Sequence, residues 1–160
     1  MVMEKTKALV SMDELVPIIR EAISMGRSVQ IFPRGISMLP MLRQGIDSVV
    51  LAPVPPKLKR YDIPLYRRDN GQYVLHRIVR VDDTYTCVGD NQFIAEPGLR
   101  HDQMIAVVTA FYRGNKKHDI TETGYLLYCY LWDYSRAFRR FFVRAWGWLS
   151  RHVKASAGKQ

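Results

Sequence analysis

The fold class of this chain follows from the stretch YVLHRIVRV at residues 73–81. This short run is rich in β-branched residues and comes directly after the turn sequence Asp69-Asn70-Gly71. A turn of this kind between two apolar runs is a strong signal for a β-hairpin. The stretch therefore predicts one strand over residues 73–81, with its hairpin partner before the turn and His76 inside the strand.

Further short apolar runs lie on either side of this stretch, separated by proline, glycine and aspartate. They cover residues 29–32, 48–51, 62–66, 85–88 and 105–112. Strands at such close spacing are typical of a compact, mostly antiparallel β-domain. We therefore expect a mainly β, α+β fold whose β-domain occupies residues 28–114.

The first 27 residues predict a single helix packed on this core. Ser11 and Glu14 match a capping box, and apolar residues then recur at helical spacing as far as Gly26. Charged residues within this amphipathic helix argue against both a transmembrane anchor and a secretory signal. We expect residues 1–27 to cover an edge or face of the sheet.

The C-terminal part predicts a long amphipathic helix at residues 124–154, after a linker at 115–123 and before a disordered tail at 155–160. No apolar run in it approaches the roughly 18 residues that span a bilayer. Its aromatic stripe and arginine-rich face are typical of a helix lying in the headgroup plane of a membrane. The alternative is that the stripe packs on the β-domain.

Positive charge is concentrated in this same segment. The chain carries a net charge of +9, of which residues 134–160 supply +7, with seven Lys or Arg and no Asp or Glu. Basic segments bind nucleic acid or anionic membranes, or form a solvated face without a partner. Residues 1–27 hold only one convincing helix, so a helix-turn-helix is not expected. We expect peripheral binding to an anionic membrane surface on the cytoplasmic face, and not to nucleic acid.

Composition sets the remaining limits. The 160 residues suffice for one domain, and 48% hydrophobic with 24% charged residues is typical of an ordinary folded protein. We expect Cys87 and Cys129 to be buried free thiols. The four histidines lack metal-ligand spacing, so we predict no metal and no cofactor.

Four short motifs resemble the boxes of the type I signal peptidase and LexA-like serine peptidase superfamily. Residues 35–40 (GISMLP) are similar to its nucleophile box, and residues 61–66 (YDIPLY) to the strand that follows it. Residues 74–79 (VLHRIV) occupy the place of the general-base box, and residues 89–91 (GDN) match the last box. Four boxes in the right order over about 80 residues are more specific than any one motif. The resemblance implies a coiled, barrel-like β-sheet with the nucleophile at its rim.

His76 stands where most bacterial members have lysine, so the chain is most similar to the endoplasmic-reticulum-type and archaeal branch. An ordinary histidine has a pKa near 6.5, so it is mostly neutral at neutral pH and can accept a proton. We predict activity that falls as the pH drops through the titration of His76. No metal or cofactor is implied.

The resemblance implies a serine endopeptidase that cleaves signal-type or leader-type peptides or preproteins, with Ser37 as nucleophile and His76 as general base. Asp90 is the first choice for orienting His76, as the third member of a triad does. Glu96, at the place of a second functional acid in the His-type enzymes, and Asp102 are alternatives. By default, Gly-Asp-Asn is simply a turn.

The oxyanion site is expected to use the Ser37 N–H, while Gly35 lacks the hydroxyl that many relatives place two residues before the nucleophile. By resemblance, small residues precede the scissile bond. Two other function classes remain. A LexA-like regulatory autoprotease needs an Ala-Gly or Cys-Gly cleavage site, which residues 1–28 lack. A non-catalytic membrane-surface binding module would keep the fold without the activity.

Overall fold

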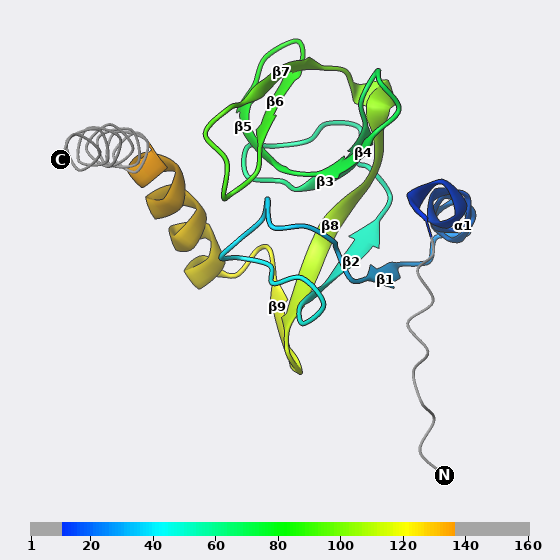
Figure 1. The fold of residues 1–160 in the computed structure, drawn as a ribbon, viewed down its shortest axis with the longest axis horizontal. Coiled ribbons are helices and arrows are strands. Elements are labelled where there is room, and N and C mark those ends of the chain that lie inside the picture. Colours follow the sequence, from blue (N-terminus) through cyan, green and yellow to red (C-terminus); the bar gives the residue numbers. More distant parts are fainter. Residues whose placement is uncertain (1–10, 137–160) are drawn as a thin grey trace, which may run out of the picture.

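The computed structural model describes residues 11–136, which form two antiparallel sheets and two α-helices (Figure 1). In chain order the elements are α1 (Met12–Ser24), β1 (Val29–Ile31), β2 (Ser48–Ala52), β3 (Pro64–Arg67), β4 (Tyr73–Leu75), β5 (Arg77–Val81), β6 (Tyr85–Val88), β7 (Glu96–Leu99), the 3₁₀ turn η1 (His101–Gln103), β8 (Met104–Arg113), β9 (Lys116–Asp119) and a helix over residues 123–136. The expected mainly β, α+β class is confirmed.

The larger sheet has the strand order β1-β2-β8-β3-β4, with β9 also paired to β8, and the smaller sheet has the order β5-β6-β7. Strand β8 lies at the centre because its ten residues, MIAVVTAFYR, are almost continuously apolar and mostly buried. Neither sheet closes on itself within residues 11–136. The barrel-like sheet that the resemblance implies is therefore not a closed barrel, and every strand pair in the described residues is antiparallel, as predicted.

The Asp69-Asn70-Gly71 turn joins β3 to β4 as predicted. Gly71 has a φ of +89°, and the Arg68 N–H donates to the carbonyl of Gln72 at 2.8 Å. Positive φ is the conformation that glycine adopts without steric cost, which explains its place in this turn.

The predicted single strand over residues 73–81 is interrupted at His76. Strand β4 pairs with β3 in the larger sheet, whereas β5 pairs with β6 in the smaller one. A strand that passes from one sheet to another must break its hydrogen-bond ladder at the crossing. His76 therefore lies at the junction of the two sheets, and not within a continuous strand as predicted.

Helix α1 begins where the sequence indicates. The Ser11 hydroxyl accepts from the Glu14 N–H at 3.3 Å, and the Glu14 carboxylate accepts from the Ser11 N–H at 3.1 Å, which completes the capping box. Val16 and Ile19 are buried in the larger hydrophobic core, together with residues of β1, β2 and β8. The helix thus packs on the sheet.

Residues 115–123 are not a linker, because β9 lies within them and pairs with β8. The second helix begins at residue 123 and is described as far as 136. The rest of its predicted span, the predicted tail at 155–160 and residues 1–10 lie outside the described residues. Cys87 and Cys129 are both buried and free, as predicted. None of the described helices has the length and apolar character that crossing a bilayer requires.

Candidate functional site

Ser37 and His76 line one pocket of about 210 Å³ at the junction of the sheets. Its walls come from the loop after β1, from the β3–β4 hairpin and from the segment after β6. The lining residues are Pro33, Arg34, Gly35, Ser37, Met38, Leu42, Arg68, Tyr73, Val74, Leu75, His76 and Gln92. Two of the four sequence boxes therefore meet in a single concave site, which is the default location for binding or catalysis.

The loop that carries Ser37 is held by the Gly-Asp-Asn box. The Asn91 N–H donates to the Ser37 carbonyl at 2.8 Å, and the Asn91 amide donates to the Ile36 carbonyl at 3.2 Å. Met38 and Leu42 are buried and anchor the loop from below. Within the described part of the chain, the Ser37 hydroxyl has no hydrogen-bond partner, so it is not engaged in a structural contact there.

His76 is nearly fully buried, with 2% of its surface exposed. Its Nδ1 lies 3.1 Å from Glu96 Oε1 and 3.3 Å from the Tyr66 hydroxyl. A carboxylate accepts hydrogen bonds only, so Nδ1 carries the proton and Nε2 is left as the basic nitrogen. Burial lowers the pKa of His76 below its usual value, and the nearby Glu96 only partly offsets this effect. The imidazole is thus neutral at neutral pH.

Gly89 lets this basic nitrogen approach the Ser37 loop. A Cβ added at residue 89 would lie 2.7 Å from the Ser37 carbonyl oxygen and 3.1 Å from His76 Nε2. The distance to the carbonyl oxygen is too short for a carbon atom and the distance to Nε2 is tight, so glycine lets the two segments meet here without a shift of the backbone. Nε2 and the Ser37 backbone consequently flank the same residue.

Arg68 holds the Glu96 carboxylate in place beside His76. The Nε and Nη2 of Arg68 donate to the two oxygens of Glu96 at 2.7 and 2.5 Å, which makes a bidentate ion pair. Burial alone would raise the pKa of Glu96, but pairing with Arg68 and His76 brings it below its usual value. Glu96 reaches this place because β7 pairs with β6, where it lies opposite Cys87.

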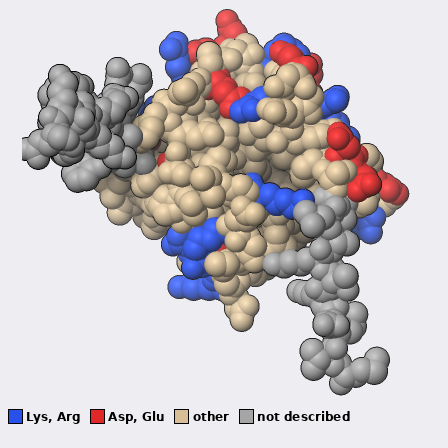
Figure 2. Space-filling view, in the orientation of Figure 1, with Lys and Arg blue, Asp and Glu red and all other residues tan. Residues whose placement is uncertain are grey.

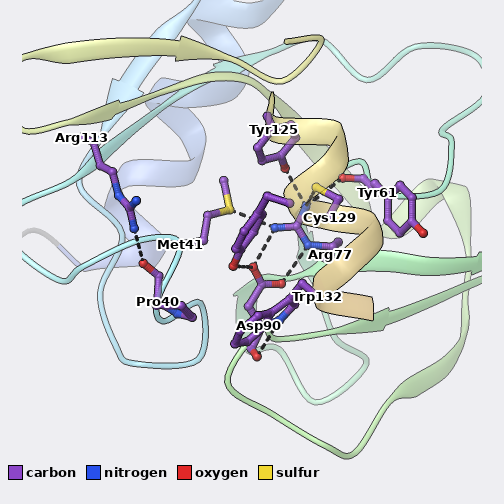
Figure 3. Close-up of polar contacts among 10 residues, drawn as sticks. Pro40, Met41, Tyr61, Arg77, Asp90, Arg113, Tyr125, Cys129 and Trp132 are labelled. Atoms are coloured by element: carbon purple, nitrogen blue, oxygen red, sulfur yellow. Dashed lines mark hydrogen bonds and ion pairs between the residues drawn. The ribbon is translucent and has the colours of Figure 1, made fainter. Parts of the chain in front are cut away.

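Asp90, the first choice for orienting His76, is paired with Arg77 instead (Figure 3). Its Oδ1 accepts from the Arg77 Nε at 2.8 Å and its Oδ2 from Nη2 at 2.7 Å. The Asp90 carbonyl also accepts from the Trp132 indole N–H at 3.0 Å. The prediction is therefore corrected: the carboxylate in contact with His76 is that of Glu96.

The helix over residues 123–136 encloses this second ion pair. Arg77 donates to the Tyr125 hydroxyl at 2.6 Å, to Cys129 Sγ at 2.9 Å and to Met41 Sδ at 3.0 Å. The Tyr128 hydroxyl donates to the Asp90 carboxylate at 3.2 Å. Figure 3 shows Arg77 surrounded by these groups, so this pair supports the fold beside the pocket without lining it.

Asp102, the third candidate acid, and the Cys87 thiol are not part of the pocket lining. Asp102 lies on η1, where it is exposed and paired with Arg100. Burial raises the pKa of the Cys87 thiol to about 12, so this cysteine is not a thiolate nucleophile at neutral pH. Within residues 11–136, no group of three or more His, Cys, Asp or Glu side chains is placed to hold a metal ion.

Comparisons with protein-family models, with curated proteins and with solved structures found no match to this chain. The site is therefore interpreted from its own geometry. Sequence reasoning identified Ser37, His76 and, as an alternative, Glu96. It missed Arg68, whose only sequence signal is its position next to the Asp69-Asn70-Gly71 turn.

Proposed function

We propose that this chain is a serine endopeptidase of the signal-peptidase type, with Ser37 as nucleophile and His76 as general base. One observation carries the proposal: Ser37 and His76 line the same pocket, and Glu96 holds the histidine so that its basic nitrogen lies beside the Ser37 loop. A serine hydroxyl is activated by a base that lies close to it, and this arrangement brings the segment of the base to the loop of the serine. We also propose that the two antiparallel sheets are a version of the signal-peptidase fold.

In this mechanism, Ser37 Oγ attacks the carbonyl carbon of the scissile peptide bond while His76 Nε2 takes the hydroxyl proton. Glu96 stabilises the imidazolium that forms. The imidazolium then passes its proton to the leaving amine, and an acyl-enzyme remains on Ser37. Water hydrolyses this ester with His76 again as base, which regenerates the serine.

The developing oxyanion needs donors that are not already engaged. The Ser37 N–H is the first. Gly35 offers no hydroxyl, and its N–H already donates to the Gln44 side chain at 3.0 Å. Gln92 lines the pocket beside Ser37 and His76, and its amide N–H₂ is the side-chain donor that we assign to the second position.

The proposal is tested with a lipophilic serine-acylating probe and intact-mass measurement. Wild-type protein is expected to gain one adduct that maps to Ser37, and the Ser37→Ala and His76→Ala variants are expected to gain none. Ser28→Ala, at an exposed serine outside the pocket, is the matched control and should label like the wild type.

Each result has a distinct meaning. An adduct that survives His76→Ala would show that another group activates the serine, and the proposed mechanism would be wrong. Absence of any Ser37 adduct in a folded wild-type protein would contradict the enzyme assignment and favour the non-catalytic binding module.

Membrane association is the second part of the proposal, and the helix over residues 123–136 supports it. One face of this helix covers Arg77 and Asp90, whereas a second face exposes five large apolar side chains: Leu126, Leu127, Tyr130, Leu131 and Tyr134. The sequence that follows is strongly basic. Figure 2 also shows a group of basic side chains at the lower left, near the β8–β9 hairpin. Exposed apolar residues next to basic ones suit an anionic lipid surface.

Vesicle flotation tests this part separately. The wild type should float with vesicles that contain anionic phosphatidylglycerol, and Leu127→Glu with Leu131→Glu should abolish flotation. The same pair of glutamates introduced at the exposed α1 positions Arg20 and Ile18 is the control. Recovery with DNA but not with anionic vesicles would overturn the membrane assignment.

A further inference from the structure

The pocket around Ser37 and His76 is more basic than a site for small apolar residues needs to be. Two arginines, Arg34 and Arg68, belong to its lining. Among the described residues that line it, none is acidic. Hence the electrostatic potential inside this pocket depends on how far each arginine is already neutralised.

The Arg68 side chain is bound to other side chains of the protein. Its Nε and Nη2 bind the two oxygens of Glu96, and its Nη1 donates to the Gln72 side chain at 2.7 Å. Its positive charge is balanced by that carboxylate, and each of its three nitrogens already donates one hydrogen bond within the protein. Arg68 therefore supports the site but offers little to a substrate.

Arg34 differs from Arg68 both in its charge, which no nearby carboxylate balances among residues 11–136, and in its N–H donors, which bind no other residue there. It is exposed at the pocket wall, two residues after Phe32 and three before Ser37, and no hydrogen bond or ion pair engages its guanidinium within the described part of the chain. It is also set between exposed apolar side chains: Phe32 is 51% and Ile36 64% exposed. A charge in a partly enclosed site with apolar neighbours is screened less than one in open water.

We propose that Arg34 selects peptides that carry an acidic side chain close to the scissile bond. The substrate class would be acidic peptide segments with apolar flanking residues, the carboxylate binding Arg34 while the flanking residues contact Phe32 and Ile36. This inference rests on the proposed peptidase function for cleavage, but the binding preference that it predicts does not require turnover.

Binding is tested first, with the Ser37→Ala protein and three synthetic peptides that differ only in Glu, Gln or Lys at one position next to the probed bond. The peptide framework is chosen from a random decapeptide mixture by mass-spectrometric enrichment on Ser37→Ala protein. We expect Glu peptides to bind about tenfold more tightly than Gln peptides, which corresponds to about 1.4 kcal/mol. The advantage should shrink as salt rises from 50 to 500 mM.

A charge reversal makes the test specific. Arg34→Gln should remove the preference for Glu, and Arg34→Glu should reverse it in favour of Lys. Arg20→Glu, at an exposed arginine on α1, should leave it unchanged. If the ratio of the affinities for the Glu and Lys peptides is the same in the wild type and in Arg34→Glu, the inference is overturned.

Cleavage by the protein with intact Ser37 separates this inference from the proposed function. Cleavage that depends on Ser37, but with no charge preference that follows residue 34, would retain the enzyme and overturn the acidic specificity. A preference that follows residue 34 in binding, without cleavage or acylation of Ser37, would support the acidic specificity and overturn the enzyme.

Discussion

Two pairs that each join a basic residue to a carboxylate lie on either side of one short segment: His76 with Glu96, and Arg77 with Asp90. His76 lines the pocket and contacts Glu96, whereas the next residue, Arg77, pairs with Asp90 and is enclosed by helix 123–136. Adjacent residues of an extended chain point to opposite sides. Two adjacent residues therefore serve different surroundings: His76 presents a titratable imidazole to the pocket, and Arg77 presents a permanent charge to Asp90 on the side of the helix.

The two pairs also differ in what a proton would do to them. His76 changes charge in the ordinary pH range, and its partner Glu96 is shared with Arg68. Arginine stays charged at any ordinary pH, so the pair of Arg77 and Asp90 keeps its strength. In the proposed mechanism, the residue that exchanges protons is thus the one that lines the pocket, whereas the pair of Arg77 and Asp90 is enclosed.

The largest effect is expected from removing the carboxylate that contacts His76. Glu96→Gln keeps the size of the side chain but offers an amide donor to His76 Nδ1, which favours the wrong tautomer. Acylation of Ser37 should slow by roughly 10³–10⁴-fold, as in other triads whose orienting acid becomes an amide. Asp90→Asn is the matched variant, and its folded fraction should keep a rate within about tenfold of the wild type. Equal losses in both would contradict the assignment of the two acids.

The next largest effect concerns stability. Arg77→Met leaves the Asp90 carboxylate buried without its main partner, and removing one member of a buried pair costs about 3–5 kcal/mol. Urea denaturation should show this loss as a lower midpoint with an unchanged slope. The control is Arg80→Met, because Arg80 is exposed and paired with Asp82, where about 0–1 kcal/mol is expected. Similar urea midpoints for both variants would show that the ion pair of Arg77 and Asp90 does not stabilise the folded protein.

A smaller effect is expected at the contact between the two segments. Gly89→Ala places a methyl group 2.7 Å from the Ser37 carbonyl oxygen, so the loop must move away from His76. We expect a loss of about 1–3 kcal/mol in stability from this crowding, together with slower acylation. Gly124→Ala has no atom within 4 Å of the added carbon and lies in a helix, so it should neither lower stability nor slow acylation. Unimpaired acylation in Gly89→Ala would argue against a close approach of Nε2 to Ser37.

The smallest effect is a shift of pH dependence. Burial lowers the pKa of His76 and the charge of Arg68 lowers it further, while Glu96 raises it. The acid limb of the acylation rate should lie below the ordinary histidine value of about 6.5. Arg68→Met should move it to higher pH, and Arg67→Met, at the neighbouring exposed arginine, should not. If the acid limb of the acylation rate lies at the same pH in Arg68→Met as in the wild type, the charge of Arg68 does not affect the pKa of His76.

The same pKa direction fixes the sign for stability. The unfolded chain binds a proton at His76 near pH 6.5, whereas the folded chain resists protonation until lower pH. Stability contributed by this residue is therefore complete above about pH 6.5 and is lost as the pH falls through that value towards the folded pKa. Thermal melts of wild type and His76→Gln should diverge least at low pH.

The sequence was sufficient for the elements with strong local signals. The Ser11 capping box, the Asp69-Asn70-Gly71 turn and the apolar run of β8 all lie where local chemistry predicts them. Strands β7 and β9 were missed because their residues resemble turns and charged loops: EPGL contains Pro97 and Gly98, and KKHD has no apolar residue. Only pairing with β6 and β8 makes these segments strands.

The choice between Asp90 and Glu96 failed for a related reason. The Gly-Asp-Asn box drew attention to Asp90, but nothing local to that box indicates that Arg77 would take its carboxylate. Which acid reaches His76 is decided by the β6–β7 register, which places Glu96 opposite Cys87. Register is a property of the folded sheet, so the sequence alone left three acids open.

The helix over residues 123–136 has a consequence for how the protein is made. Its side chains complete the surroundings of Arg77 and Asp90, which lie 38 to 52 residues before the helix residues that contact them. During translation the strands emerge well before this helix, so the ion pair is still open to water when the β-domain first collapses. The surroundings of this ion pair are therefore complete only once Trp132, which donates to the Asp90 carbonyl, has left the ribosome.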